Sequence, residues 1–378
     1  MINSKKYRIV FLTGTRADFG KIKALVAKLT ESHTFEVFLF VTGMHMMARY
    51  GSTWVEVQSS QLGQVYTFIN QNQDDSMEVV FAKTVSGFSD YVREVKPDMV
   101  VVHGDRIEAL AGATVGALAG VRVAHIEGGE ISGTVDELIR HAVTKLSHLH
   151  FVSNEEARGR VVQLGEDSEH IFVIGSPDID IMNSQSLPTL EQVMNYYQFD
   201  FTDYGILMFH PVTTELERLQ VDARTIVDFV LDTGLNFVVI LPNNDLGSHL
   251  ILDEYARFAG FPRIRVFPSM RFEYFLTTLN SARFILGNSS AGVREAPHFG
   301  VPAINVGTRQ FRRSTSDRVI NCEITRQALF DGLNAALAME RVPEHRFGSG
   351  NSAEQFLNRL REEKLWRVPI QKTFNDLD

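Results

Sequence analysis

Short apolar runs alternate with longer segments of helical periodicity along almost the whole chain. In the first half the apolar runs predict strands at residues 8–13, 35–42, 99–103, 121–126, 148–152 and 170–174. In the second half they predict strands at residues 206–209, 237–241, 264–267, 284–286 and 302–306. Because strands that alternate with helices form parallel sheets with helices on both faces, the pattern predicts an α/β protein.

The alternation pauses once, after Gly175-Ser176-Pro177, where the polar stretch 178–190 resembles a linker. A length of 378 residues also favours two domains. We therefore predict two Rossmann-like, doubly wound domains that face each other, at residues 1–177 and 178–359. A last helical pattern at 353–364 predicts a closing helix, and residues 360–378 are expected to return to the first domain.

The composition of the chain excludes several kinds of partner, metal site and membrane segment. A net charge of -9 and a pI near 5.8 argue against nucleic-acid and anionic-membrane partners. The one cysteine, Cys322, excludes an internal disulfide and a cysteine-rich metal site and fits a reducing compartment. The longest uncharged, small-apolar stretch, 109–121, is too short to span a bilayer, and residues 1–16 predict a first strand rather than a signal peptide. We expect a soluble cytoplasmic protein.

Carboxylates gather where two predicted strands end. The strand at 121–126 leads into His-Ile-Glu-Gly-Gly-Glu and a segment that reaches His141, and the strand at 99–103 ends in His-Gly-Asp-Arg. The segment between them, 107–120, is rich in Ala and Gly and predicts a helix packed closely on the sheet, so that the whole forms one βαβ unit. Asp105, Glu127 and the segment 130–141 should then border one crevice. Carboxylates in unlike surroundings can serve as separate acids and bases, whereas Glu130 and Glu137 alone could simply be solvated.

The second half carries polar loops at its own strand ends. Gly-Asn-Ser-Ser-Ala-Gly (287–292) follows a strand and precedes a predicted helix, a pattern that favours phosphate binding but is also that of an ordinary capped helix start. His210 follows another strand, where it could contact a diphosphate or be a structural histidine. Arg309 offers a guanidinium to a ribose or phosphate. The turn at 13–18 contains no GxGxxG, so a dinucleotide fingerprint is absent.

Together these segments resemble the hydrolysing UDP-N-acetylglucosamine 2-epimerases, which include bacterial enzymes of sialic acid synthesis and the epimerase half of an animal bifunctional enzyme. The resemblance covers nearly the full chain and rests on the motifs at 13–18, 41–45, 103–106, 125–130 with 140–141, 210–214, 242–245, 287–295 and 307–310. The runs at 41–47 and 269–276 look closest to bacterial enzymes that make N-acetylmannosamine for capsular sialic acid. Non-hydrolysing relatives carry Glu-Ala-Gly-Leu-Arg where this chain has Glu-Gly-Gly-Glu.

The resemblance implies a GT-B-like fold with UDP between the domains, and conversion of UDP-N-acetylglucosamine and water to UDP and N-acetylmannosamine through 2-acetamidoglucal. It implies that Asp105, Glu127 and Asp136 are catalytic. His45 would assist as an acid or a sugar contact, unless it is structural. Substrate binding is expected at eleven positions: Arg16, Asp18, Arg106, Arg140, His210, Asn243, Met270, Ser289, Ser290, Glu295 and Arg309. Glu295 is best suited to ribose hydroxyls, because a carboxylate accepts hydrogen bonds and repels phosphate.

The expected chemistry uses no cofactor and no metal, since His, Asp and Glu occur without a sharp ligand spacing. A homodimer is expected from the family alone. Three alternatives stay open. The same reaction could act on a UDP-2,4-diacetamido-trideoxy sugar, as in legionaminic acid synthesis. A glycosyltransferase would share the fold and nucleotide site, and a noncatalytic nucleotide-sugar sensor would have no reason to keep the acids.

Overall fold

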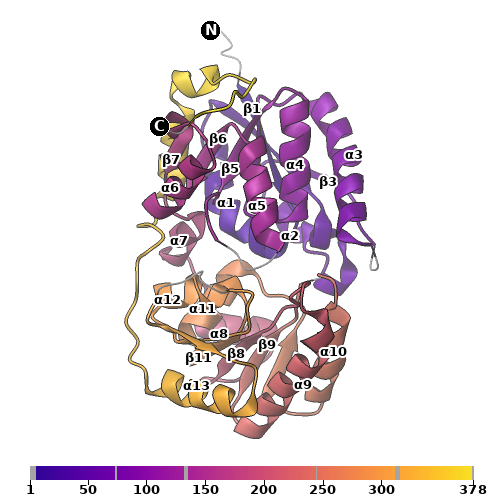
Figure 1. The fold of residues 1–378 in the computed structure, drawn as a ribbon, viewed down its shortest axis with the longest axis vertical. Coiled ribbons are helices and arrows are strands. Elements are labelled where there is room, and N and C mark those ends of the chain that lie inside the picture. Colours follow the sequence, from indigo (N-terminus) through magenta and orange to yellow (C-terminus); the bar gives the residue numbers. More distant parts are fainter. Residues whose placement is uncertain (1–5, 73–74, 132–134, 244, 311–315, 377–378) are drawn as a thin grey trace. The chain divides into compact units, whose positions relative to one another are not determined.

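The computed structural model of the chain describes residues 6–72, 75–131, 135–243, 245–310 and 316–376. It divides into two compact units (Figure 1). The first consists of Met1–Glu130, Asp136–Ser184 and Phe347–Asp378, and the second of Ile131–Val135 and Gln185–Arg346. Each is built around one parallel sheet, which confirms the predicted α/β class.

The first unit holds a seven-stranded sheet in the order β3-β2-β1-β4-β5-β6-β7. All of its neighbouring strands are parallel; for example, Ile9 of β1 lies opposite Val37 of β2 and Met99 of β4. The strands are β1 (Tyr7–Thr13), β2 (Phe35–Val41), β3 (Gln64–Thr67), β4 (Met99–His103), β5 (Arg122–Ile126), β6 (Leu149–Val152) and β7 (Ile171–Val173). The sequence pattern predicted all of these except β3.

Helices cover both faces of this sheet (Figure 1). They are α1 (Arg16–Thr30), α2 (Trp54–Ser59), α3 (Met77–Val95), α4 (Ile107–Leu118), α5 (Val135–Leu146), α6 (Glu155–Gln163), α7 (Pro177–Met182) and α14 (Ser352–Leu360), with short 3₁₀ turns η1 (Gly43–Met46), η2 (Ala48–Tyr50), η3 (Ser168–His170) and η6 (Glu363–Arg367). The predicted close approach of α4 is explained by its glycines. A Cβ added at Gly116 would lie 2.6 Å from Val123 Cγ2, and one at Gly112 would lie 2.8 Å from Val102 Cγ1. Larger residues there would push α4 off the sheet.

The chain returns to the first unit at its carboxyl-terminal end. Helix α14 packs against α1 and α7, and its Phe356 lies in one buried cluster with Phe11 and Phe151 of the sheet. Because α7 and α14 both pack on α1, the contacts place residues 178–184 and 347–359 with the first unit, whereas the sequence pattern predicted them in the second domain. The closing helix ends at Leu360 and is followed by η6 rather than by a longer helix.

The second unit holds a six-stranded parallel sheet in the order β10-β9-β8-β11-β12-β13. Its strands are β8 (Gly205–Met208), β9 (Phe237–Ile240), β10 (Ile264–Phe267), β11 (Phe284–Gly287), β12 (Ala303–Val306) and β13 (Val319–Cys322). Its helices are α8 (Leu190–Tyr197), α9 (Leu216–Thr233), α10 (Ser248–Tyr255), α11 (Phe272–Ser281), α12 (Glu295–His298) and α13 (Arg326–Ala338), with 3₁₀ turns η4 (Ala256–Phe258) and η5 (Ser290–Gly292). Of the six strands, the sequence pattern predicted all except β13.

Both sheets follow the strand order of doubly wound nucleotide-binding folds, in which ligands bind beyond the carboxyl ends of the strands where the order reverses. In the first unit this switch point lies between β1 and β4, and in the second between β8 and β11. No helix among the residues that the structure describes is long and apolar enough to cross a membrane.

Candidate active site

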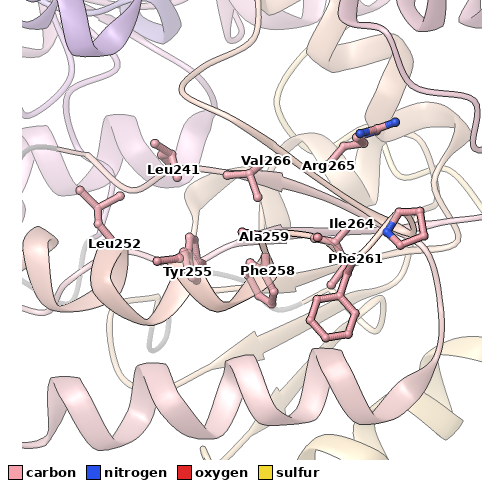
Figure 2. Close-up of a pocket in the computed structure, with 12 residues that line it drawn as sticks. Leu241, Leu252, Tyr255, Phe258, Ala259, Phe261, Ile264, Arg265 and Val266 are labelled. Atoms are coloured by element: carbon pink, nitrogen blue, oxygen red, sulfur yellow. The ribbon is translucent and has the colours of Figure 1, made fainter.

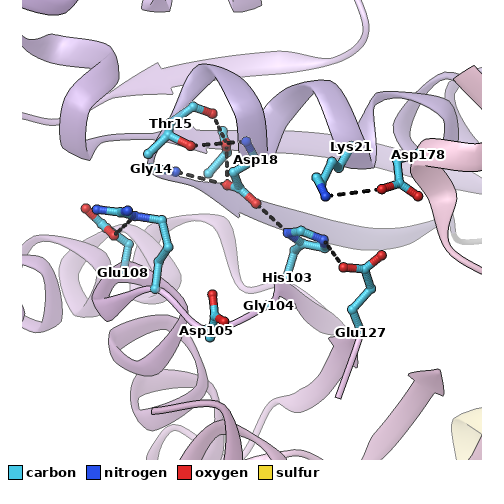
Figure 3. Close-up of polar contacts among 12 residues, drawn as sticks. Gly14, Thr15, Asp18, Lys21, His103, Gly104, Asp105, Glu108, Glu127 and Asp178 are labelled. Atoms are coloured by element: carbon cyan, nitrogen blue, oxygen red, sulfur yellow. Dashed lines mark hydrogen bonds and ion pairs between the residues drawn. The ribbon is translucent and has the colours of Figure 1, made fainter. Parts of the chain in front are cut away.

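The first unit places three titratable side chains in a row at its switch point (Figure 3). His103 is the last residue of β4, Glu127 directly follows β5, and Asp18 lies in the first turn of α1. The Nδ1 atom of His103 donates to Asp18 Oδ1 at 2.8 Å, and its Nε2 atom donates to Glu127 Oε2 at 3.2 Å. The side chains of all three are largely buried, with exposed fractions of 9%, 11% and 4% for His103, Asp18 and Glu127.

The electrostatics of this row favour a charged histidine. Burial by itself disfavours the imidazolium, but the hydrogen bonds and charges of Asp18 and Glu127 outweigh it and raise the pKa of His103 to about 9. Burial likewise opposes ionisation of Asp18, yet the contact with His103 and the hydrogen bonds from Thr13 and Gly14 keep its pKa below the ordinary value. These shifts favour an imidazolium at His103 that pairs with the Asp18 carboxylate at neutral pH.

Glu127 is held in a strained backbone conformation. Its φ of 62° lies in the left-handed region, which costs a non-glycine residue about 1–3 kcal/mol and is typical of functional sites. Its backbone N–H donates to Phe151 O at 2.9 Å, and Arg140 Nη1 donates to its carbonyl oxygen at 2.9 Å. Ser176 Oγ donates to its carboxylate. These contacts stabilise the strained residue and fix the direction of its side chain.

Arg140 of α5 connects the Asp105 carboxylate with the backbone of Glu127. Its side chain is 2% exposed, and its guanidinium donates both to the Glu127 carbonyl and to the carboxylate of Asp105. Asp105 follows Gly104, whose φ of 68° lets the chain turn directly after β4. Asp136 lies in the first turn of α5, four residues before Arg140 and hence on the same helix face. Arg140 thus contacts Asp105 and the backbone of Glu127, and Asp136 lies one helical turn before it on α5.

His45 has surroundings that favour its structural alternative. The side chain is fully buried, its Nε2 atom lies 3.3 Å from Thr13 Oγ1, and its Nδ1 atom lies 2.7 Å from Thr53 Oγ1. Burial lowers its pKa to about 4. A neutral ring with both nitrogens engaged by hydroxyl groups is suited to tying β1 to the loop after β2 rather than to transferring protons.

The two arginines expected at the diphosphate each carry an acidic neighbour. Arg16 Nε lies 2.9 Å from Glu56 Oε2, and Arg106 Nε lies 3.4 Å from Glu108 Oε2. Glu108 is 1% exposed and fits against the loops after β1 and β2: a Cβ at Gly14 would lie 2.8 Å from its Cδ, and one at Gly43 would lie 2.6 Å from its Oε1. A Cβ at Gly14 would therefore meet a buried carboxylate, and one at Gly43 would meet that carboxylate and, at 2.5 Å, the backbone oxygen of Gly14.

In the second unit, Asn288 joins the loops at the switch point. Its buried side chain accepts from His210 N at 2.7 Å and donates to His210 O at 2.9 Å. His210 Nδ1 in turn accepts from Asn243 N at 3.1 Å, so the neutral ring carries its proton on Nε2. Arg309 and Gln310 both donate to Asn288 O, at 3.3 and 3.0 Å. Loops after β8, β9, β11 and β12 are thereby held together.

The remaining predicted residues of this unit lie at its strand ends. Ser289 caps η5 by accepting from Ala291 N at 3.3 Å, Ser290 begins η5, and buried Glu295 begins α12. Met270 is buried between β10 and α11. The segment after Ser289 forms a 3₁₀ turn and then a four-residue helix. The prediction of a long helix whose dipole would attract phosphate is therefore wrong here. Residues 132–134 of the segment 130–141 and residue 244 of the motif 242–245 lie outside the described residues.

A pocket of about 640 Å³ lies elsewhere in the second unit, between α10, η4 and β10 (Figure 2). Its lining is mostly apolar and includes Leu241, Tyr255, Phe258 and Ile264, with Arg265 as its charged side chain. None of its lining residues is a predicted site residue. Within the described ranges, no three His, Cys, Asp or Glu side chains are arranged to hold a metal ion.

Comparison with known families agrees with the motifs. The family model described as UDP-N-acetylglucosamine 2-epimerase matches residues 27–361. The chain belongs to this family. It is 46% identical over 375 residues to a UDP-N-acetylglucosamine 2-epimerase of Neisseria meningitidis, an alignment that covers 98% of this chain and 99% of that protein. It is 34% identical to a Legionella pneumophila protein named UDP-N,N'-diacetylbacillosamine 2-epimerase (hydrolyzing), over 92% of this chain and 94% of that one.

Solved structures of other epimerases share the fold. A UDP-GlcNAc 2-epimerase of Methanocaldococcus jannaschii, in complex with UDP-GlcNAc and UDP, aligns with a TM-score of 0.79 and 21% identity over 93% of this chain and 99% of that chain. One from Neisseria meningitidis bound to UDP-GlcNAc aligns with a TM-score of 0.76 and 18% identity over the same shares. At these identities the likeness concerns the fold, and it confirms the predicted GT-B-like class.

Four residues of this epimerase acquire a role only from the structure: His103, Glu108, Ser176 and Asn288. His103 and Asn288 lie within quoted motifs, so their positions at strand ends were a usable signal. Glu108 lies two residues after His-Gly-Asp-Arg, where the sequence pattern predicts the first turn of a helix and gives no sign of a role in the site. Ser176 reads as a helix cap, and its contact with Glu127, 49 residues away, leaves no local pattern.

Proposed function

We propose that the enzyme is a hydrolysing UDP-N-acetylglucosamine 2-epimerase, which converts UDP-N-acetylglucosamine and water to N-acetylmannosamine and UDP. The observation that carries the proposal is the row of Asp18, His103 and Glu127 beside the Asp105–Arg140 pair at the switch point of the first sheet. The 34% and 31% identical relatives that are named as hydrolyzing support the release of free sugar. The Glu-Gly-Gly-Glu sequence of 127–130 supports the same branch.

The reaction follows from the chemistry of the sugar. The C2 proton is weakly acidic because no carbonyl group adjoins C2. Cleavage of the C1–O bond therefore runs ahead of proton removal, and its electron pair leaves with UDP. Carboxylates around C1 and C2 stabilise the developing cation, and one of them takes the C2 proton to give 2-acetamidoglucal. Water then adds at C1 while a proton returns to C2 from the opposite face, which inverts that carbon.

The nucleotide contacts in this proposal come from both sequence halves. Arg16 and Arg106 compensate the diphosphate charge, and Asp18 and Arg140 lie closer to the reacting sugar. In the second unit we assign the UDP contacts to residues that follow the carboxyl ends of the strands: His210, Asn243, Met270, Ser289, Ser290, Glu295 and Arg309. The Nε2–H of His210 is suited to donate to phosphate oxygen.

Two substitutions test the placement of the nucleotide. Ser290→Ala and Arg309→Ala should each weaken UDP binding by roughly 1 to 3 kcal/mol, since each removes a hydrogen-bond donor to an anion or a ribose. Calorimetric titration with UDP measures the effect. Arg326→Ala is the matched control, because Arg326 is an exposed arginine of the same unit that pairs with Asp232. Equal UDP affinity in all three variants and the parent would contradict the placement.

The proposed reaction has a direct test with UDP-N-acetylglucosamine as the only substrate. We expect UDP and free N-acetylmannosamine, with deuterium at C2 when the reaction is run in D2O. In ¹⁸O-water the label should enter the sugar and not UDP, because the C1–O bond is the one that breaks. A non-hydrolysing epimerase would release no UDP, a simple hydrolase would keep protium at C2, and a glycosyltransferase would need an acceptor.

A second substrate deserves comparison because of the Legionella relative. The greater identity to the Neisseria protein, 46% against 34%, leads us to expect a higher kcat/KM with UDP-N-acetylglucosamine than with its 2,4-diacetamido-trideoxy analogue. Reversed kcat/KM values would assign the chain to the analogue. By the same family resemblance we propose a cytoplasmic homodimer that supplies N-acetylmannosamine to sialic acid synthesis.

A further inference from the structure

Ser176 occupies the N-cap of α7 but does not use its hydroxyl as a cap. A serine at this position commonly accepts a hydrogen bond from a backbone N–H of the first helical turn, which stabilises a helix by about 1 kcal/mol. Among the described residues, the Ser176 side chain accepts no such bond from α7. Its Oγ instead donates to Glu127 Oε1, and the residue is fully buried. The capping interaction is replaced by a contact with a predicted catalytic carboxylate.

The backbone at Ser176 is held by the returning chain segment 347–352. Ser176 N donates to Phe347 O at 2.7 Å, and Ser352 Oγ donates to Ser176 O at 3.1 Å. The preceding residue, Gly175, packs so closely on this segment that a Cβ there would lie 3.2 Å from Gly348 Cα. A Cβ on Gly348 would lie 2.8 Å from Gly175 Cα. The hydroxyl of Ser176 is thus presented to Glu127 from a fixed backbone.

Glu127 consequently has a donor on each carboxylate oxygen, Ser176 on Oε1 and His103 on Oε2. Two donors fix the plane of the carboxylate, and donors of this kind favour its ionised form. Charged groups around it include Arg140 with its partner Asp105, Asp18 beyond His103, and Lys21 of α1, which pairs with Asp178 in the first turn of α7. Ser176 differs from these groups because it is uncharged, and its hydroxyl contacts the carboxylate of Glu127 directly.

We propose that Ser176 is a positioning residue for Glu127. Its hydroxyl holds the carboxylate in one orientation and keeps it ionised, so that Glu127 meets the substrate as a base or anion rather than as a proton donor. The backbone of Ser176 is fixed by its N–H bond to Phe347 O, which does not involve the Ser352 side chain. This inference rests on the proposed function, in which Glu127 acts at C1 and C2 of the sugar.

The test compares Ser176→Ala with Ser352→Ala. Both remove one buried hydroxyl from the same contact region, but only the first removes a donor to Glu127. Ser176→Ala should lower kcat roughly tenfold or more, as expected for loss of a hydrogen bond to a charged group. KM should change little, and the acid limb of the kcat profile should move to higher pH. Ser352→Ala should keep the parent's acid limb, and Ser176→Cys, with a weaker donor, should fall between Ser176→Ala and the parent.

A readout that needs no turnover separates this inference from the proposed function. In protein labelled with ¹³C at the glutamate carboxyl carbon, the signal missing from Glu127→Gln identifies Glu127. Its titration should move to higher pH in Ser176→Ala but not in Ser352→Ala. An unchanged titration and an unchanged acid limb, in an enzyme that releases N-acetylmannosamine, would overturn the role of Ser176 and leave the function standing. A parent enzyme that releases no N-acetylmannosamine would overturn the function, whatever the titration shows.

Discussion

The variants Asp105→Asn, Glu127→Gln and Asp136→Asn should bind UDP nearly as well as the parent but lose about 10²- to 10⁴-fold in kcat, the range typical of losing a positioned acid or base. Each substitution keeps the shape of the side chain and removes its charge and its capacity to carry a proton. Arg140 holds Glu127 through its backbone carbonyl, which Glu127→Gln leaves intact, so the position of this residue should persist while its chemistry fails. Steady-state kinetics with UDP-N-acetylglucosamine and calorimetry with UDP measure the two effects separately.

Glu137→Gln is the matched control for this series. Glu137 follows Asp136 on α5, its side chain is 38% exposed, and its carboxylate lies 3.5 Å from His141. It should retain near-parent turnover. Supplying 2-acetamidoglucal then assigns the steps: a variant that hydrates the glycal but cannot form it has lost the elimination, and the reverse result assigns its residue to hydration. Near-parent turnover in all three variants would remove this carboxylate cluster as the active site.

The hydrophobic pattern predicted the two sheets because most of their strands are buried on both faces. The two strands that it missed, β3 and β13, lie at sheet edges. Most of their residues are partly or fully exposed. Without burial on both sides such a strand has no continuous apolar run, and β3 has the sequence Gln-Val-Tyr-Thr. Pairing with a neighbour, which decides that these segments are strands, is a property of the folded sheet.

The candidate site was predictable as far as topology and helix spacing determine it. The βαβ unit of β4, α4 and β5 brings Asp105 and Glu127 to one edge, as the sequence order requires. The contacts of Ser176 with Glu127 and of Asn288 with His210 span 49 and 78 residues. They depend on the direction of individual side chains, which no sequence spacing expresses. His45 lies in the motif 41–45 at the end of a strand, which suggested a role in the site, yet its contacts with Thr13 and Thr53 favour a structural role.

The hydrogen-bond partners explain why the pKa of His103 differs from that of its neighbour His125. Both rings lie at the carboxyl-terminal ends of adjacent strands. His125 is fully buried, its Nε2 donates to Gly104 O at 2.8 Å, and its Nδ1 lies 3.1 Å from Thr144 Oγ1. Because its partners are neutral, burial dominates and lowers its pKa to about 3. His103 has two carboxylate partners instead, and its pKa rises to about 9. The partners, not the depth, decide which ring is charged.

The variant His103→Asn should therefore lose about 3–5 kcal/mol of stability near pH 6.5, because it leaves Asp18 and Glu127 as buried carboxylates without their cation. The cost should depend on pH. A histidine with a raised folded pKa stabilises the protein fully below its unfolded value near 6.5, and the stabilisation is lost as pH rises through about 9. The difference in urea midpoint between parent and variant should accordingly shrink from pH 6.5 to pH 9.5. His125→Asn, which replaces a ring that is neutral in the folded protein, should show a difference that does not shrink over this range. A gap for His103→Asn that stays constant over this range would mean that His103 is neutral in the folded protein, and the charged row at the switch point would have to be abandoned.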